Sequence, residues 1–116
     1  MNKNSKLMNE ITIDEFSKLD IRIGKVVEAK RVEGTYKLLL LKVNLGNEVR
    51  TIVAGIGDQY EPEFLLNKKV VVLANLKPKV IRGIESQGMI LCAVDENQNV
   101  YPLTTMGEAK EGSKVY

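Results

Sequence analysis

One short stretch of the sequence carries cations at a spacing that suits the binding of an anion. Residues 75–91, NLKPKVIRGIESQGMIL, contain Lys77, Lys79 and Arg82 but a single carboxylate. Pro78 lacks a backbone donor and limits the flexibility of this stretch, so less entropy is lost when phosphate groups are bound. Each of these cations that touches a phosphate makes the affinity depend on salt. The pattern predicts a loop that binds a polyanion.

A second group of cations lies earlier in the chain. Residues 22–50 contain seven cations and three acids, although the net charge of the whole chain is only +2. If both groups fold onto one side of the molecule, the resulting field steers an anion towards it. Ordinary solvated strand faces would give the same counts, so charge alone does not decide between the two interpretations. The seven cations are Arg22, Lys25, Lys30, Arg31, Lys37, Lys42 and Arg50.

The side chains that most enzymes and metal sites use are scarce. The 116 residues include no histidine, so the usual general base and the commonest metal ligand are missing. Glu61 and Glu63 flank Pro62, where acids commonly complement the start of a helix. Gly55 and Gly57 lack the third glycine and the long helix of a phosphate-binding loop. We therefore expect a non-catalytic protein without a cofactor or a metal ion.

Cysteine usage and hydropathy indicate the compartment. Cys92 lies in the apolar run at residues 89–94, where we prefer a small buried hydrophobe over a nucleophile. A lone cysteine forms no intrachain disulfide, and the sequence has neither a signal peptide nor an apolar run of membrane-spanning length. We expect a cytoplasmic protein that does not enter a membrane.

The N-terminal part of the chain predicts a disordered lead-in and a short helix. The first ten residues are polar and aperiodic, as in a disordered terminus. Thr12 and Glu15 then have the spacing of a capping box, which marks the start of a helix. Ile13 and Phe16 lie on one face of that helix.

Apolar alternation predicts β-structure for most of the remaining chain. The stretch DIRIGKVVEAKRV changes phase after Gly24, as a bent or bulged barrel strand requires. Gly46 and Asn47 separate two apolar strands, YKLLLLKVNL and EVRTIVAGI, as in a hairpin. Pro62 opens a brief helix. The stretches KKVVVLANL and GMILCAV predict further strands, and a last one is predicted near residues 100–103.

About five strands, with one helix between the third and the fourth, indicate an all-β fold. We predict a five-stranded OB-fold barrel with a short N-terminal helix and a C-terminal extension, and an SH3-like barrel is the alternative. OB barrels bind through one strand face and the loops that join strands 1–2 and strands 4–5. The sequence VEGTYK falls in the first loop and the basic stretch in the second. The two basic regions are therefore predicted to be neighbours.

Two apolar runs are too long for strands with one buried face. Residues 38–41 and 70–73 are apolar throughout, whereas only alternate residues of a barrel strand face the core. Something must cover the remaining side chains. The candidates are the N-terminal helix, the segment after Thr104 and a second copy of the chain. We favour a second copy together with that segment.

The scarcity of aromatic residues bears on the kind of ligand. Proteins that bind single strands stack bases on aromatic side chains. This chain lacks tryptophan, and Tyr36 and Tyr60 are the only candidates near the predicted face. The composition therefore favours recognition of the backbone and shape of a folded RNA over a row of unstacked bases.

Several motifs, in order, resemble the tRNA-binding domain family. They are FSKLDIRIGKVVEAKRVEGTYKLLLLKVNLGNEVRTIVAGI, YEPEFLLNKKVVVLANLKP and RGIESQGMIL, and the similarity runs from about residue 11 to residue 94. This family includes the C-terminal domains and separate β subunits of methionyl-tRNA synthetases and stand-alone structure-specific tRNA-binding proteins. The resemblance implies an OB fold, a homodimer and binding to the outer corner of tRNA. It also implies an auxiliary subunit that supports aminoacylation beside a catalytic subunit.

The resemblance further implies which residues bind tRNA. Ser86 is then a phosphate or 2′-hydroxyl contact, and a turn-capping serine is the alternative. For Met89 a core position is the preferred alternative. Lys79 is included because it belongs to the basic stretch itself. The predicted tRNA-binding residues are Arg22, Lys25, Lys37, Lys77, Pro78, Lys79, Arg82, Ser86, Gly88 and Met89.

Two other functions stay open. A related export-chaperone branch uses the same barrel to hold unfolded or presecretory polypeptides, but that branch lacks the full R-G-x-x-S-x-G-M block found here. In the other case the main contact is the synthetase, and RNA binding is secondary. For every one of these functions we predict one domain at residues 11–116, whose C-terminal extension serves dimerisation.

Overall fold

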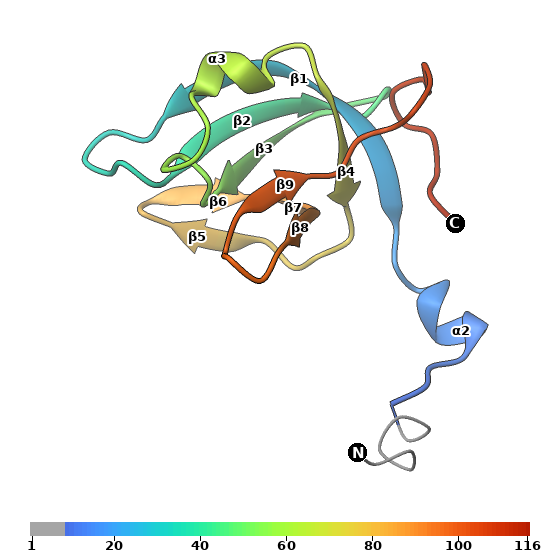
Figure 1. Ribbon diagram of the computed structural model, residues 1–116. Helices are drawn as coiled ribbons and strands as arrows, with labels where there is room; N and C mark the ends of the chain where they lie inside the picture. The colour runs from blue at the N-terminus through green and yellow to red at the C-terminus, as the bar shows by residue number, and fades with distance from the viewer. Residues whose placement is uncertain (1–8) are drawn as a thin grey trace.

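The fold is built on a curled sheet of five antiparallel strands (Figure 1). The computed structural model describes residues 9–116, so the predicted lead-in lies mainly outside the described residues. The order in the sheet is β3-β2-β1-β4-β7. These strands are β1 (Ile21–Arg31), β2 (Leu39–Asn44), β3 (Val49–Ala54), β4 (Lys69–Leu73) and β7 (Met89–Ile90). Two small sheets are added by β5 (Lys79–Ile81) with β6 (Ile84–Ser86) and by β8 (Cys92–Val94) with β9 (Val100–Pro102).

The long strand β1 bends so that it can pair with two partners. Its first half pairs with β4, from Ile21 to Lys25, and its second half pairs with β2 up to Arg31. The register shifts between Val26 and Glu28, which is where a bulge bends the strand. The predicted irregularity is confirmed, but it lies a few residues beyond the predicted glycine.

Closure of the barrel joins β3 to the segment between β6 and β7. The Gln87 N–H donates to the carbonyl oxygen of Thr51 across 2.8 Å, and the Val53 N–H donates to Ser86 Oγ across 2.9 Å. With a helix between β3 and β4, this strand order is that of an OB barrel. The predicted fold class is confirmed, and the SH3-like alternative is not the one adopted.

Strict alternation along β2 fills the core of the barrel. Leu39, Leu41 and Val43 are fully buried, whereas the residues between them are half-buried. They pack with Ile52 of β3 and Val72 of β4 in one apolar cluster. Burying side chains of this size contributes about 1.5–3 kcal/mol each, which makes the alternation the main determinant of register.

Two short helices lie at the positions that the sequence predicts. Helix α2 (Ile13–Phe16) begins with the complete capping box of Thr12 and Glu15, and helix α3 (Pro62–Leu65) begins with its proline. Helix α2 projects from the barrel in Figure 1, and none of its residues is buried. The side chain of Ile13 is 74% exposed, whereas Phe16, on the same face of this helix, packs against Ile21, Ile23 and Val71 of the barrel.

The C-terminal tail covers part of the outer face of β1 and β4. Its residues pair with the backbone of β1, because the Val115 N–H donates to the Ile21 oxygen and the Ile23 N–H donates to the Ser113 oxygen. Ala109 and Val115 pack against the cluster of Ile21, Ile23 and Val71. The predicted cover by the segment after Thr104 is confirmed for this face.

The predicted strand GMILCAV is wrong in one respect. It is divided at Leu91, whose N–H bonds to Val71 of β4 and whose oxygen bonds to Leu103. The two halves therefore belong to different sheets, β7 to the barrel and β8 to the hairpin with β9. Within residues 9–116, no helix is long and apolar enough to cross a membrane.

Candidate nucleic-acid interface

The basic stretch folds into a hairpin with a two-residue turn. Ile81 of β5 pairs with Ile84 of β6, so Arg82 and Gly83 form the turn. Their φ angles are 53° and 79°, as in a type I′ turn, whose twist matches that of the flanking strands. A non-glycine residue at positive φ stores strain, and such strain concentrates at functional positions. The turn therefore holds the Arg82 side chain at the tip of the hairpin.

The hairpin tip contacts the loop between β1 and β2. The Arg82 guanidinium donates from Nη2 to the carbonyl oxygen of Gly34 across 2.5 Å. Both Lys30 and Arg82 line a hollow between these two segments. The prediction that the two basic regions are neighbours is confirmed by this contact.

Arg31 fixes the conformation of the β1–β2 loop. Its Nη1 donates to the oxygen of Tyr36 at 2.5 Å and to that of Gly57 at 2.6 Å, and its Nη2 lies 3.2 Å from Glu61. The guanidinium carbon also lies 4.8 Å from the centre of the Tyr36 ring. In addition, the Gly57 N–H donates to the Lys37 oxygen across 2.6 Å. Arg31 is one of the seven cations of the earlier basic region, but no role was predicted for it. Charge patterning does not reveal a side chain that bridges two loops.

Five cations on these loops are free to meet an anion, and we call them the basic loop patch. All five side chains are exposed, and among residues 9–116 none of them lies in an ion pair. An exposed cation without a partner can exchange water for a phosphate oxygen without first breaking a salt bridge. The basic loop patch consists of Lys30, Lys37, Lys77, Lys79 and Arg82, and the exposed Pro78 lies between its two lysines at 77 and 79.

Arg22 and Lys25 lie in the first half of β1, which pairs with β4, and their part in one shared cationic surface stays a prediction. Arg22 precedes the bulge in β1, whereas Arg31 follows it. The Arg22 guanidinium pairs with Asp20 at 2.9 Å and lowers the pKa of that carboxyl, while the pKa of Arg22 is raised by the same hydrogen bond. Lys25 lies between Asn44 and Lys69. The two halves of β1 thus pair mainly with different strands, β4 for the first half and β2 for the second.

Of three further predicted site residues, Ser86 and Gly88 have structural roles and Met89 is exposed. Ser86 is 5% exposed, and its hydroxyl accepts from the Val53 N–H and donates to the Gly88 oxygen at 3.1 Å. Gly88 has a φ of 140°, and a Cβ there would lie 3.0 Å from the Leu73 oxygen. Met89 is 44% exposed opposite Leu73, so the core position preferred for it is wrong. Its short strand leaves the side chain on the outer face of the barrel.

These observations define the class of protein as an OB-fold module with cations on the loops through which OB barrels commonly bind. The chain belongs to the family described as putative tRNA binding domain, whose model matches residues 21–114. It is 50% identical over 113 residues to the methionine–tRNA ligase of Pyrococcus horikoshii. That alignment covers 97% of this chain but only 16% of the ligase.

Solved structures of the same size show the same fold. A methionyl-tRNA-synthetase-related protein from Pyrococcus horikoshii has a TM-score of 0.90 and 43% identity, covering 94% of this chain and 100% of that one. The chaperone CsaA from Bacillus anthracis has a TM-score of 0.83 and 28% identity, covering 92% and 99%. The fold is thus shared between proteins named for a synthetase and proteins named as chaperones.

Proposed function

We propose that this chain binds folded tRNA through the basic loop patch and supports aminoacylation as a non-catalytic, auxiliary β subunit of methionyl-tRNA synthetase in the cytoplasm. The observation that carries the proposal is the contact of Arg82 with Gly34, which joins unpaired cations from two distant segments. Similarity to methionine–tRNA ligases supports the link to that synthetase. The catalytic subunit is the expected partner, because this chain corresponds to 16% of such a ligase.

The basic loop patch is better suited to binding the phosphate backbone of an RNA than to binding a row of bases. Its members are lysines and one arginine on loops, and cations of this kind contact phosphates without reading sequence. The Tyr36 ring is 67% exposed, but one of its faces already lies against Arg31. Of the predicted contacts, we retain five, add Lys30, and leave out five: retained are Lys37, Lys77, Pro78, Lys79 and Arg82, and left out are Arg22, Lys25, Ser86, Gly88 and Met89.

A homodimer is the second part of the proposal. Exposed apolar side chains gather around α2 and the tail, where Ile13, Leu19 and Tyr116 line one hollow. Apolar groups of this kind are commonly covered by a partner. Residues 11–116 would then act as one domain with α2 and the tail as its dimer contact. Two tRNA sites on one dimer, or a site tethered to an enzyme, gain affinity through effective concentration.

Binding of unfolded polypeptides is the second candidate function. The likeness to chaperone CsaA favours it, since that fold match covers nearly both chains. A filter-binding competition separates the two functions. Labelled bulk tRNA is bound to the pure protein and challenged with excess unlabelled tRNA or an excess of an unfolded polypeptide. Displacement by tRNA alone supports the proposal, whereas retention of the polypeptide and no retention of tRNA contradicts it.

A further inference from the structure

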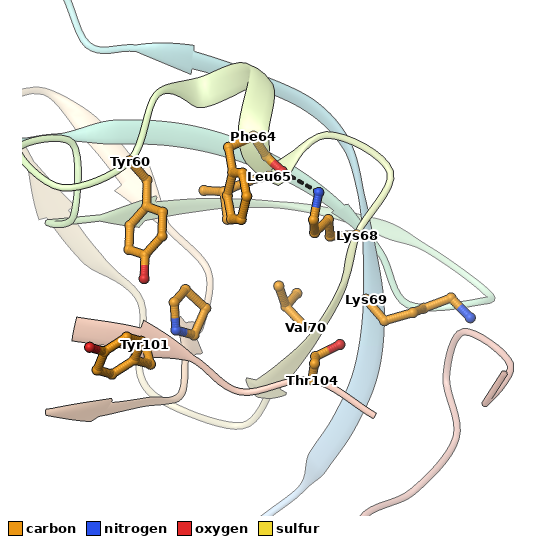
Figure 2. A pocket seen from close by; sticks show the side chains of 9 residues that line it. Tyr60, Phe64, Leu65, Lys68, Lys69, Val70, Tyr101 and Thr104 are labelled. Atoms are coloured by element: carbon orange, nitrogen blue, oxygen red, sulfur yellow. Dashed lines mark hydrogen bonds between the residues drawn. The ribbon is translucent and has the colours of Figure 1, made fainter. Parts of the chain in front are cut away.

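A cleft outside the basic loop patch opens between α3, the start of β4 and β9. Its volume is about 300 Å³, at the lower end of the range for small-ligand sites. Figure 2 shows Tyr60 and Phe64 on one side of the cleft, Tyr101 and Thr104 on the other, and Lys68 at one end. None of the predicted tRNA-binding residues lines this cleft, although Tyr60 was one of two aromatic candidates for base stacking.

The interior of the cleft is apolar and has aromatic walls. Leu65 and Val70 are each 2% exposed at its floor. The rings of Tyr60 and Phe64 stack with centroids 5.4 Å apart, and the Tyr60 hydroxyl donates to the Val100 oxygen across 2.5 Å. Tyr101 is 51% exposed, so its ring is available to a ligand. A flat, apolar group fits between such walls.

Cations line the rim of the cleft. Lys68 Nζ lies 4.3 Å from the centre of the Phe64 ring and donates to the Phe64 oxygen across 2.7 Å. Lys69 Nζ donates to the oxygen of Ala109. Neither lysine forms an ion pair within residues 9–116. Both lysines also line an adjoining hollow with Lys25 and Lys110.

The positive charge at the rim of the cleft affects the pKa of a neighbouring acid. The pKa of the Glu111 carboxyl is lowered first by a backbone hydrogen bond and further by the charges of Lys69, Lys25 and Lys110. Four lysines stand against two acids, Glu108 and Glu111, around the two hollows. The rim therefore favours a ligand that carries negative charge.

We propose that this cleft binds one unpaired nucleotide of an RNA, with its base beside Tyr101 and its phosphate near Lys68 and Lys69. Base stacking on an aromatic ring beside a cationic groove is the general mode by which proteins hold unpaired nucleotides. An apolar peptide side chain would fit the floor of the cleft, but it would supply no negative charge to Lys68 and Lys69. The inference rests on the proposed function and adds a second contact with the same RNA.

The cleft and the basic loop patch are connected through one segment. Gly57 bonds to Lys37 of the patch, and Tyr60 lines the cleft three residues later. The Cα atoms of Gly57 and Tyr60 are therefore at most about 11 Å apart. Gln59 also fixes β9 on this segment, through bonds to the Gln98 oxygen and the Val100 N–H. A single RNA can therefore reach both sites.

Substitution of Tyr101 tests the inference. The pure full chain is titrated with bulk tRNA at moderate salt, and Tyr101→Ala is compared with Tyr101→Phe. Loss of the ring should weaken binding about tenfold, whereas the phenylalanine variant should bind like the parent, because it keeps the stacking surface. Both variants change an exposed side chain, and thermal unfolding verifies that each remains folded. Lys68→Ala should also weaken binding and make it less dependent on salt.

The outcomes separate this inference from the proposed function. If the parent does not bind tRNA, both fail. If the parent binds tRNA and Tyr101→Ala binds it equally well, the cleft holds no nucleotide and only the further inference fails. An unfolded polypeptide whose binding depends on Tyr101 while tRNA binding does not would assign the cleft to peptides instead. That result would also overturn the inference.

Discussion

The Arg82 guanidinium lies 2.5 Å from the carbonyl oxygen of Gly34, although 48 residues separate them in the chain. This hydrogen bond holds the tip of the β5–β6 hairpin against the loop between β1 and β2. Of the remaining cations of the basic loop patch, Lys37 lies on that loop and Lys79 on β5, while Lys30 lies at the end of β1 and Lys77 just before β5. The contact therefore brings the two cationic segments together. Loss of the contact should affect RNA binding more than folding.

Arg82→Gly tests whether the Arg82 side chain contributes to RNA binding rather than to folding. Glycine adopts the positive φ of this turn position without the cost of about 1 kcal/mol that an L side chain incurs. The free energy of unfolding should therefore stay the same or rise, while the affinity for tRNA falls. Thermal unfolding and a tRNA titration on the same samples measure both quantities. Unchanged affinity would make Arg82 a residue of the turn alone.

Ser86→Ala should have the opposite profile. The buried hydroxyl accepts from the Val53 N–H and donates to the Gly88 oxygen, so its removal leaves two backbone groups without a partner. We expect a loss of about 1–3 kcal/mol in the free energy of unfolding. In folded protein, the salt dependence of tRNA binding should equal that of the parent. If tRNA binding by Ser86→Ala depended less on salt than binding by the parent, Ser86 would be an RNA contact after all.

Local signals in the sequence predicted the elements of the fold well. Gly46 with Asn47, and Pro62, mark a turn and a helix start through backbone preferences that need no tertiary contact. Apolar alternation gave the strands because burial of Leu39 and Leu41 outweighs other local preferences. The turn at Arg82 escaped prediction because arginine is uncommon at positive φ, so the hairpin was expected as a plain loop.

The site was harder to predict because charge patterning carries no information on where a strand bends. Arg22 and Arg31 belong to one strand, yet the first pairs with Asp20 and the second bridges two loops. The bridging role of Arg31 depends on the oxygen of Gly57, a contact across 26 residues. Tyr101 was missed for a similar reason, since only the folded chain places it opposite Phe64.

Ile13→Asp tests the proposed dimer. Ile13 is 74% exposed on α2, and an acid in the first turn of a helix is compatible with its dipole. The parent should sediment as a dimer and the variant as a monomer in analytical ultracentrifugation. Val94→Asp, at a position that is 57% exposed on β8, is the matched control and should stay dimeric. A monomeric parent would contradict the proposal.

Asp20→Asn should change the dependence of stability on pH. The hydrogen bond from Arg22 lowers the pKa of Asp20 below its ordinary value of 3.8. The ionised carboxyl therefore stabilises the fold above that value, and the contribution is lost as the pH falls through the lowered pKa. We expect a deficit of about 1 kcal/mol or less at neutral pH, which disappears as the pH falls through the lowered pKa of Asp20. Asp14→Asn, an acid outside any ion pair among residues 9–116, should behave like the parent in thermal unfolding.

The central claim is that cations from two loops bind phosphates of one folded RNA. The decisive measurement is the slope of the logarithm of the tRNA association constant against the logarithm of salt concentration. We compare the parent with the double variant Lys77→Ala, Arg82→Ala and with a control variant, Lys18→Ala, that removes an exposed charge outside the patch. The account predicts weaker binding and a slope shallower by about two for the patch variant only. Equal slopes and affinities in all three proteins would contradict it.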